Sequence, residues 1–282
     1  MSARRVCWLL LFALASGLGA GCGAPVSTYD RVLARGELVV GVKDDSPPFG
    51  VRDAKDGSYW GFDVDLAAKI AEKLGVPVRY VPVRSATRIG LLNDGTVDLL
   101  AAAMTITRER ERLVDFSLPY FATEQAFLVP QAAAIAGYAD LARKKVAAVS
   151  GTTSLDNLKE VQPDAELVAF DDYPRALAAL KAGQVDALTT DFVLLSGINT
   201  EEQSRSGKDE FKIVGRFGSE PYGLALREND SKFRDAVNTI LQELWDRGTL
   251  QGLIENWFNE RGRFPVKVQF NMITFPKGAP AK

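Results

Sequence analysis

The alternation of strand and helix patterns along this 282-residue chain is the feature that most limits its fold. Short apolar runs typical of buried strands are separated by amphipathic stretches with helical spacing. In the first half we expect strands at 37–43, 78–83 and 97–103 and helices at 63–74 and 86–93. After Pro130 we expect strands at 145–149, 166–170 and 185–188 and helices at 153–161 and 174–182. This order predicts parallel sheets with right-handed crossovers.

Two stretches at equivalent points of these units indicate that the plan is repeated. They are Gly95-Thr96-Val97-Asp98-Leu99-Leu100 and Gly183-Gln184-Val185-Asp186-Ala187-Leu188. The sequence therefore predicts an α/β protein with two similar lobes, completed by a strand at 222–226 and helices at 230–245 and 250–258. We expect Asp63 to cap the helix at 63–74, and the polar residues 200–210 to form a solvated loop.

The amino-terminal segment predicts export. Arg4 and Arg5 precede an apolar run from residue 6 to 20, and the whole of residues 1–21 has the pattern of a secretory signal peptide. The run is too short to span a bilayer comfortably. Cys22 follows small residues, as in a bacterial lipoprotein, so we expect residues 22–36 to be a lipid-anchored tether. The usual Leu stands one place early, at Leu18, which leaves simple cleavage and a free periplasmic protein as the alternative.

Composition excludes several classes of function. The only cysteines are Cys7 and Cys22, and the chain has no histidine, so the preferred ligands of zinc, copper and haem are missing. Catalysis by Ser-His-Asp or Cys-His groups is likewise excluded. The formal net charge of −2 gives no basic surplus for nucleic acid. We therefore expect no metal, no cofactor and no nucleic-acid partner.

Polar groups that follow predicted strands form a candidate binding site. The strand at 97–103 leads into Met104-Thr105-Ile106-Thr107-Arg108-Glu109-Arg110, which brings hydroxyls and a guanidinium to the carboxyl end of a parallel sheet. Ligands bind at that edge in open α/β sheets. The arrangement predicts a receptor for a carboxylate, with a solvated surface turn as the alternative.

Two further candidates follow strands of the second unit. Thr153 begins a helix, where backbone N–H groups favour an anion, and Asp191 ends the strand that contains residues 185–188. Simple helix capping is the alternative for each residue. Together with Thr105 and Arg110 they supply donors for a carboxylate and an acceptor for an ammonium, the two adjacent groups of a free α-amino acid.

These motifs closely resemble those of the amino-acid-binding solute-binding proteins that feed ABC importers. The resemblance covers roughly residues 31–260, and it implies that Thr105 and Arg110 hold the α-carboxylate, with Thr153 clamping it from the second lobe and Asp191 binding the ammonium. It also implies a two-lobe periplasmic binding protein fold with mostly parallel sheets and a hinge of two segments, corresponding to Ala126–Val129 and Tyr222–Leu226. The lobes would then be residues 37–127 with 222–262, and residues 128–221. The segment 263–282 lies outside the resemblance, as an extra strand or a disordered tail.

Other positions bear on the ligand's side chain. Binders of basic amino acids in this family carry an acid and an aromatic where this chain has Lys43 and Ser46, which argues against a cationic ligand. Lys43 and Arg88 match positions that the aspartate- and glutamate-binding branch uses for the distal carboxylate, and Tyr173 resembles a pocket residue of that branch. The alternatives are an exposed lysine and an ordinary surface arginine. Phe49 and Tyr120 are expected to pack in the core or hinge.

We therefore expect an exported, lipid-anchored monomer that captures glutamate or aspartate by hinge closure and delivers it to an ABC permease. Its partners would be the free amino acid, the permease and, through the anchor, the membrane. The alternatives are a protein that binds glutamine or another polar amino acid and a ligand-sensing lipoprotein. A dehydratase-like enzyme on the same scaffold would need a general acid, and the sequence offers no pocket carboxylate beyond Asp191.

Overall fold

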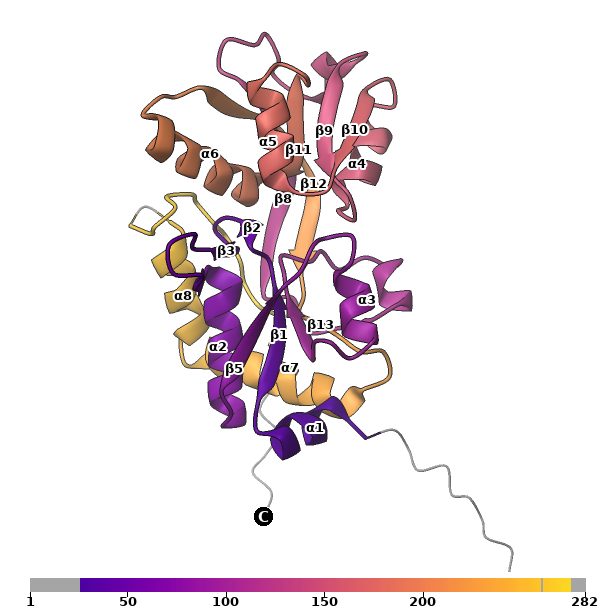
Figure 1. Ribbon diagram of the computed structural model, residues 1–282, viewed down its shortest axis with the longest axis vertical. Coiled ribbons are helices and arrows are strands. Elements are labelled where there is room, and N and C mark those ends of the chain that lie inside the picture. Colours follow the sequence, from indigo (N-terminus) through magenta and orange to yellow (C-terminus); the bar gives the residue numbers. More distant parts are fainter. Residues whose placement is uncertain (1–25, 260, 275–282) are drawn as a thin grey trace, which may run out of the picture.

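The protein forms two α/β lobes, one above the other in Figure 1. This computed structural model describes residues 26–259 and 261–274, so the predicted signal peptide and Cys22 lie outside the described residues. The predicted two-lobe fold is confirmed. Among the described residues, no helix combines the length and apolar character needed to cross a membrane.

The two main sheets share one plan. The lobe 1 sheet has the order β5 (Val78–Pro82), β1 (Leu38–Val42), β6 (Leu99–Ala101), β13 (Ala225–Leu226) and β7 (Asp115–Phe116). The lobe 2 sheet has the order β10 (Glu166–Phe170), β9 (Lys145–Val149), β11 (Ala187–Asp191), β8 (Phe121–Pro130) and β12 (Phe211–Tyr222). In each sheet the first three strands are parallel and the rest join antiparallel. The repeated strand–helix order of the sequence thus produces the same strand order twice.

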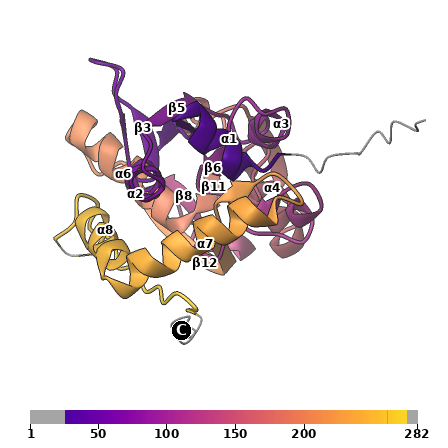
Figure 2. The same ribbon diagram turned by 90° about the horizontal axis from the view of Figure 1, so that it is seen from below.

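Helices cover the sheets because their apolar faces need burial. Lobe 1 carries α1 (Thr28–Arg35), α2 (Phe62–Leu74), α3 (Arg88–Asn93), α7 (Ser231–Asp246) and α8 (Thr249–Trp257). Lobe 2 carries α4 (Ser154–Val161), α5 (Tyr173–Lys181) and α6 (Phe192–Ser206). Figure 2 shows α7 running across lobe 1 with α8 beside it. Short pieces complete the fold, namely the sheet of β2 (Asp45–Ser46), β3 (Gly50–Arg52) and β4 (Tyr59–Trp60) and the 3₁₀ turns η1 (Arg110–Arg112) and η2 (Tyr138–Leu141).

Two long antiparallel strands, β8 and β12, connect the lobes (Figure 1). They pair from Phe121↔Tyr222 at the lobe 1 end to Phe211↔Pro130 in lobe 2. The first crossing therefore begins at Phe121, earlier than the predicted segment 126–129, because residues 125–128 already pair with β11 inside lobe 2. The second crossing ends at Tyr222, where the predicted segment begins.

A cluster of aromatic rings packs where these strands leave lobe 1. Phe121 lies with its ring centroid 5.2 Å from that of Phe49 and 5.1 Å from that of Phe258. Phe49 and Tyr120 are fully buried, as expected for core or hinge residues. Edge-on and tilted contacts of this kind are the favourable arrangements of aromatic rings, so the base of the hinge is firmly packed.

Three local expectations are wrong. The tether predicted for residues 22–36 is helical from Thr28 to Arg35, since Asp230 accepts hydrogen bonds from Ser27 Oγ and Thr28 N, both at 2.6 Å.

The solvated loop predicted for 200–210 is helical to Ser206, where buried Glu202 binds Lys181 and Arg205. Asp63 is no cap, because α2 begins at Phe62 and the Asp63 carboxylate accepts from Tyr120 Oη and Ala103 N instead.

The chain after α8 returns over lobe 1. Phe264 stacks against Trp60 and Trp257, and the Arg263 guanidinium lies 3.9 Å from the Trp60 ring centroid. Residues 266–270 form no strand, yet the backbone of Val266 and Val268 bonds to Asn259. Residues 263–274 are thus coil packed on lobe 1 and not an extra strand, and residues 275–282 of the predicted tail lie outside the described residues.

Candidate functional site

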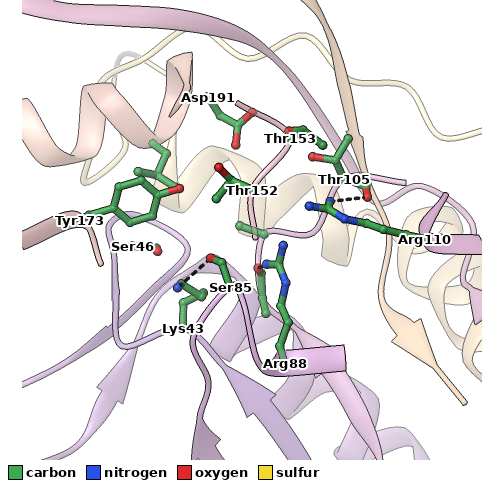
Figure 3. A pocket seen from close by; sticks show the side chains of 13 residues that line it. Lys43, Ser46, Ser85, Arg88, Thr105, Arg110, Thr152, Thr153, Tyr173 and Asp191 are labelled. Carbon is green, nitrogen blue, oxygen red and sulfur yellow. Dashed lines mark hydrogen bonds between the residues drawn. The ribbon is translucent and has the colours of Figure 1, made fainter. Parts of the chain in front are cut away.

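A narrow cavity lies between the two lobes and is lined by all seven predicted ligand-binding residues (Figure 3). Its lining is Lys43, Ser46, Ser85, Arg88, Ala102, Ala103, Thr105, Arg110, Thr152, Thr153, Tyr173, Asp191 and Leu194. The lining residues come from strand ends and helix starts of both lobes, where parallel sheets bind ligands. The other six lining residues were not predicted as site residues: Ser46, Ser85, Ala102, Ala103, Thr152 and Leu194. Ser85 and Thr152 have a local signal, since each stands close to a predicted residue in the same loop.

Arg110 bridges the lobes at one end of the cavity. Its Nη1 donates to the Thr105 carbonyl oxygen at 2.8 Å, and its Nη2 donates to the Gly151 carbonyl oxygen of lobe 2 at 3.0 Å. Thr105 itself forms an isolated bridge with Tyr222 of the connecting strand. Burial lowers the pKa of the Arg110 guanidinium. The alternative of a merely solvated turn is therefore wrong for this residue.

Asp191 ends β11 and is 6 % exposed. One carboxylate oxygen accepts from Gln125 Nε2 at 3.0 Å, and the other accepts from Tyr222 Oη at 2.6 Å. Burial, followed by the nearby charge of Glu220, raises the pKa of Asp191 to about 7. The side chain makes no capping bond to α6, so the capping alternative fails.

Thr153 also does not cap its helix through its side chain. Its hydroxyl donates to Glu220 Oε2 at 3.0 Å, while the residue lines the cavity at the start of α4. Gln125, Glu220 and Tyr222, which hold Thr153 and Asp191, all lie on the connecting strands β8 and β12. Sequence reasoning missed these three, and only the contacts across the fold identify them.

Lys43 and Arg88 are both buried in lobe 1, at 1 % and 3 % exposure, so the alternatives of surface residues are wrong. Lys43 Nζ donates to Ser85 Oγ at 3.1 Å and pairs with Asp45 Oδ1 at 3.1 Å. Burial lowers the pKa of the Lys43 ammonium.

Arg88 has a different environment from Lys43. Its Nη1 donates to the Ala102 carbonyl oxygen at 2.6 Å, its Nε has no partner, and no carboxylate of the described residues forms a salt bridge with it. Burial, and then repulsion from Arg110, lowers the pKa of Arg88 to about 9.

Tyr173 forms the cavity wall on the lobe 2 side. Its hydroxyl bonds to Thr190 Oγ1 at 2.9 Å, and its ring centroid lies 5.8 Å from Lys43 Nζ. The Tyr173 backbone N–H donates to Asp45 across the lobe boundary at 3.4 Å. Figure 3 shows Tyr173 and Asp191 facing Lys43 and Arg88 across the cavity.

These contacts describe a closed arrangement of the lobes. A Cβ atom placed on Gly151 of lobe 2 would lie 2.5 Å from Ala86 of lobe 1. Similarly, a Cβ on Gly197 would lie 2.2 Å from the Pro47 carbonyl oxygen. Only glycine permits so close an approach of two backbones.

The sequence matches the family described as bacterial extracellular solute-binding proteins, family 3, over residues 38–260. The chain belongs to this family. The resemblance stated from the motifs is thereby confirmed, and the extracellular setting of the family agrees with the predicted export. The anchor at Cys22 stays a prediction.

Relatives of this solute-binding protein are named as amino-acid-binding proteins, one of them as part of an ABC transporter. It is 35 % identical to the ABC transporter glutamine-binding protein GlnH of Bacillus subtilis over 260 residues, which cover 89 % of this chain and 93 % of that protein. It is 33 % identical to the glutamate-binding protein GluB of Corynebacterium glutamicum, over 79 % of this chain and 78 % of that protein. A solved ancestral arginine-binding protein bound to glutamine is 39 % identical, with a TM-score of 0.73 over 79 % of this chain and 98 % of that one.

The close approach at Gly151 generates a prediction about closure. Gly151→Ala should hold the lobes apart, because its methyl group meets the Ala86 backbone. Gly183→Ala is the matched control, since Gly183 also has a positive φ (65° against 79°) but nothing lies within 4 Å of its Cβ position. Small-angle scattering with saturating amino acid should show a larger radius of gyration for Gly151→Ala than for the control. Equal radii would contradict this role for Gly151.

Proposed function

We propose that this protein binds a free acidic amino acid, glutamate or aspartate, in the interlobe cavity and presents the closed complex to an ABC permease. Arg110 and Thr105 would hold the α-carboxylate with the start of α4, and Asp191 would hold the ammonium. Lys43, Arg88 and Tyr173 would surround the ligand's side chain. The relatives named for ABC transport, glutamine binding and glutamate binding support the class of ligand.

The observation that carries the acidic assignment is the unpaired charge of Arg88. The described lining contains three cations, Lys43, Arg88 and Arg110, and one acid, Asp191. A zwitterionic ligand matches Arg110 with its carboxylate and Asp191 with its ammonium, and Asp45 already pairs with Lys43. Arg88 then remains as a buried charge without a salt bridge, which is costly unless the ligand supplies an anion.

Glutamine is the second candidate, and the Lys43–Asp45 pair favours it. Because Asp45 neutralises Lys43, only one net positive charge faces the ligand's side chain. An amide oxygen can accept from both Lys43 and Arg88, although it leaves the Arg88 charge uncompensated. Two relatives, including GlnH, are glutamine-binding proteins by name.

Calorimetric titration of the mature protein with glutamate, aspartate, glutamine, asparagine and arginine tests the proposal. Tighter binding of glutamate or aspartate than of either amide supports it. If glutamine binds more tightly than both acids, the acidic assignment is wrong while amino-acid binding stands. If none of these ligands binds, the assignment of the cavity to free amino acids is wrong.

Arg88 should set the preference for an acid. In Arg88→Gln the charge that a distal carboxylate compensates is gone, so glutamate should lose at least about tenfold in affinity, or about 1.4 kcal/mol. Glutamine should lose less affinity, so the ratio of glutamate affinity to glutamine affinity should fall. Arg79→Gln is the control, because the Arg79 side chain is 54 % exposed and pairs with Glu37 away from the cavity. An unchanged ratio of glutamate to glutamine affinity in Arg88→Gln would contradict the role.

Affinity should fall as the pH decreases through about 7. Asp191 binds a proton there in the free protein, because burial and Glu220 raise its pKa, whereas an ammonium beside it requires the charged carboxylate. Below that pH the loss should approach about tenfold per pH unit. Arg88 stays protonated over this range, because its pKa is about 9. Burial also raises the pKa of Asp63 to about 7, but Asp63 lies outside the cavity lining, so we expect Asp191 to set the midpoint.

Isothermal titration of glutamate between pH 5.5 and 8.5 measures this dependence. Repeating the titration in buffers of different ionisation enthalpy should show proton release on binding near pH 6. Affinity that is flat over this range, with no proton release, would mean that Asp191 is already charged in the free protein.

A further inference from the structure

Glu220 is a buried acid outside the cavity lining, and the proposed function gives it no part in positioning the ligand. It lies on the connecting strand β12 and is 3 % exposed. Its Oε2 accepts from Thr153 Oγ1 at 3.0 Å, and its Oε1 accepts from Asn157 Nδ2 at 2.6 Å. Both carboxylate oxygens are therefore engaged by the first turn of α4 rather than directed at the cavity.

The bond from Thr153 to Glu220 fixes the direction of a hydroxyl. A threonine hydroxyl has one hydrogen to donate and lone pairs with which to accept. Because an ionised carboxylate can only accept, the Thr153 hydrogen points to Glu220 and is not available to a ligand. The Thr153 oxygen also accepts a long bond from Gln125 Nε2 at 3.5 Å. Because Thr153 lines the cavity (Figure 3) and a hydroxyl oxygen has two lone pairs, the hydroxyl can still accept, but not donate, a bond from a group bound there.

We propose that Glu220 is a positioning residue that makes the Thr153 hydroxyl an acceptor for the ligand's α-ammonium. The inference rests on the proposed amino-acid ligand and deepens it. The ammonium would then find two acceptors on lobe 2, the Asp191 carboxylate and the Thr153 hydroxyl. The α-carboxylate would be held by Arg110 and by backbone N–H groups at the start of α4, not by the Thr153 hydroxyl as the family resemblance implies.

Glu220→Gln tests this, because an amide of the same shape can donate to Thr153 and so free the hydroxyl hydrogen. The probes are glutamate and 2-hydroxyglutarate, whose α-hydroxyl can accept a hydrogen bond where an ammonium cannot. Glutamate affinity should fall by about three- to thirtyfold, whereas 2-hydroxyglutarate should bind as well as before or better. The ratio of glutamate affinity to 2-hydroxyglutarate affinity should therefore fall at least fivefold. Glu124→Gln, an acid on β8 with a side chain 48 % exposed, is the control and should change neither affinity.

A double-mutant cycle separates this role from a structural one. In a Thr153→Val background at pH 8.5, where Asp191 is ionised with or without the Glu220 charge, Glu220→Gln should change glutamate affinity less than twofold, because the hydroxyl through which Glu220 acts is absent. Glu220→Gln alone should also move the pH midpoint of glutamate affinity downward, since the Glu220 charge helps to raise the pKa of Asp191. Equal weakening of both ligands, or full additivity in the cycle, would overturn the proposal.

The outcome is independent of the acidic assignment. If the wild-type protein prefers glutamine, the probes become glutamine and its 2-hydroxy analogue instead of glutamate and 2-hydroxyglutarate. The same fall in the ratio of affinities is expected, because glutamate and glutamine share the α-ammonium. A wild-type protein that binds 2-hydroxyglutarate as tightly as glutamate would show that the ammonium is not recognised. That result would overturn the role of Glu220.

Discussion

The placement of two guanidinium groups in one small cavity is the constraint on which the closed structure depends. Arg88 is buried, Arg110 is half-buried, and burial together with repulsion from Arg110 lowers the pKa of Arg88. Charges removed from water are costly unless something compensates them. The chain supplies backbone carbonyl oxygens but no carboxylate in a salt bridge to either group among the described residues. Compensation by a bound anion would therefore stabilise the closed lobes more than the open ones.

The connecting strands do more than join the lobes. Gln125 on β8 and Glu220 and Tyr222 on β12 bond directly to Thr153 and Asp191 on the cavity side of lobe 2. The aromatic cluster around Phe121 anchors the other end of the same strands in lobe 1. A rotation at these strands would therefore act on the site directly through a few hydrogen bonds.

The positions of the strand ends could be predicted from sequence, because the spacing of apolar residues and the glycines that flank them are local signals. All seven site candidates follow from that rule or from the family resemblance, and all line the cavity. The partners of those residues could not be predicted, because Glu220 lies 67 residues from Thr153 in sequence and Asp230 lies 202 residues from Thr28. The helix at 200–206 was missed because its buried Glu202 is stabilised by ion pairs and breaks the apolar pattern.

The aromatic stack over lobe 1 has a spectroscopic consequence. Trp60, Trp245 and Trp257 are the tryptophans of the described residues, and all three lie in lobe 1 outside the cavity lining. Trp60 and Trp257 are stacked with centroids 5.9 Å apart, and Arg263 covers Trp60. Two of the seven tyrosines, in contrast, lie at the site: Tyr173 lines the cavity and Tyr222 holds Asp191. Tryptophan emission therefore reports the packing of lobe 1, whereas a molecule in the cavity would lie beside a tyrosine ring and beside no tryptophan of the described residues.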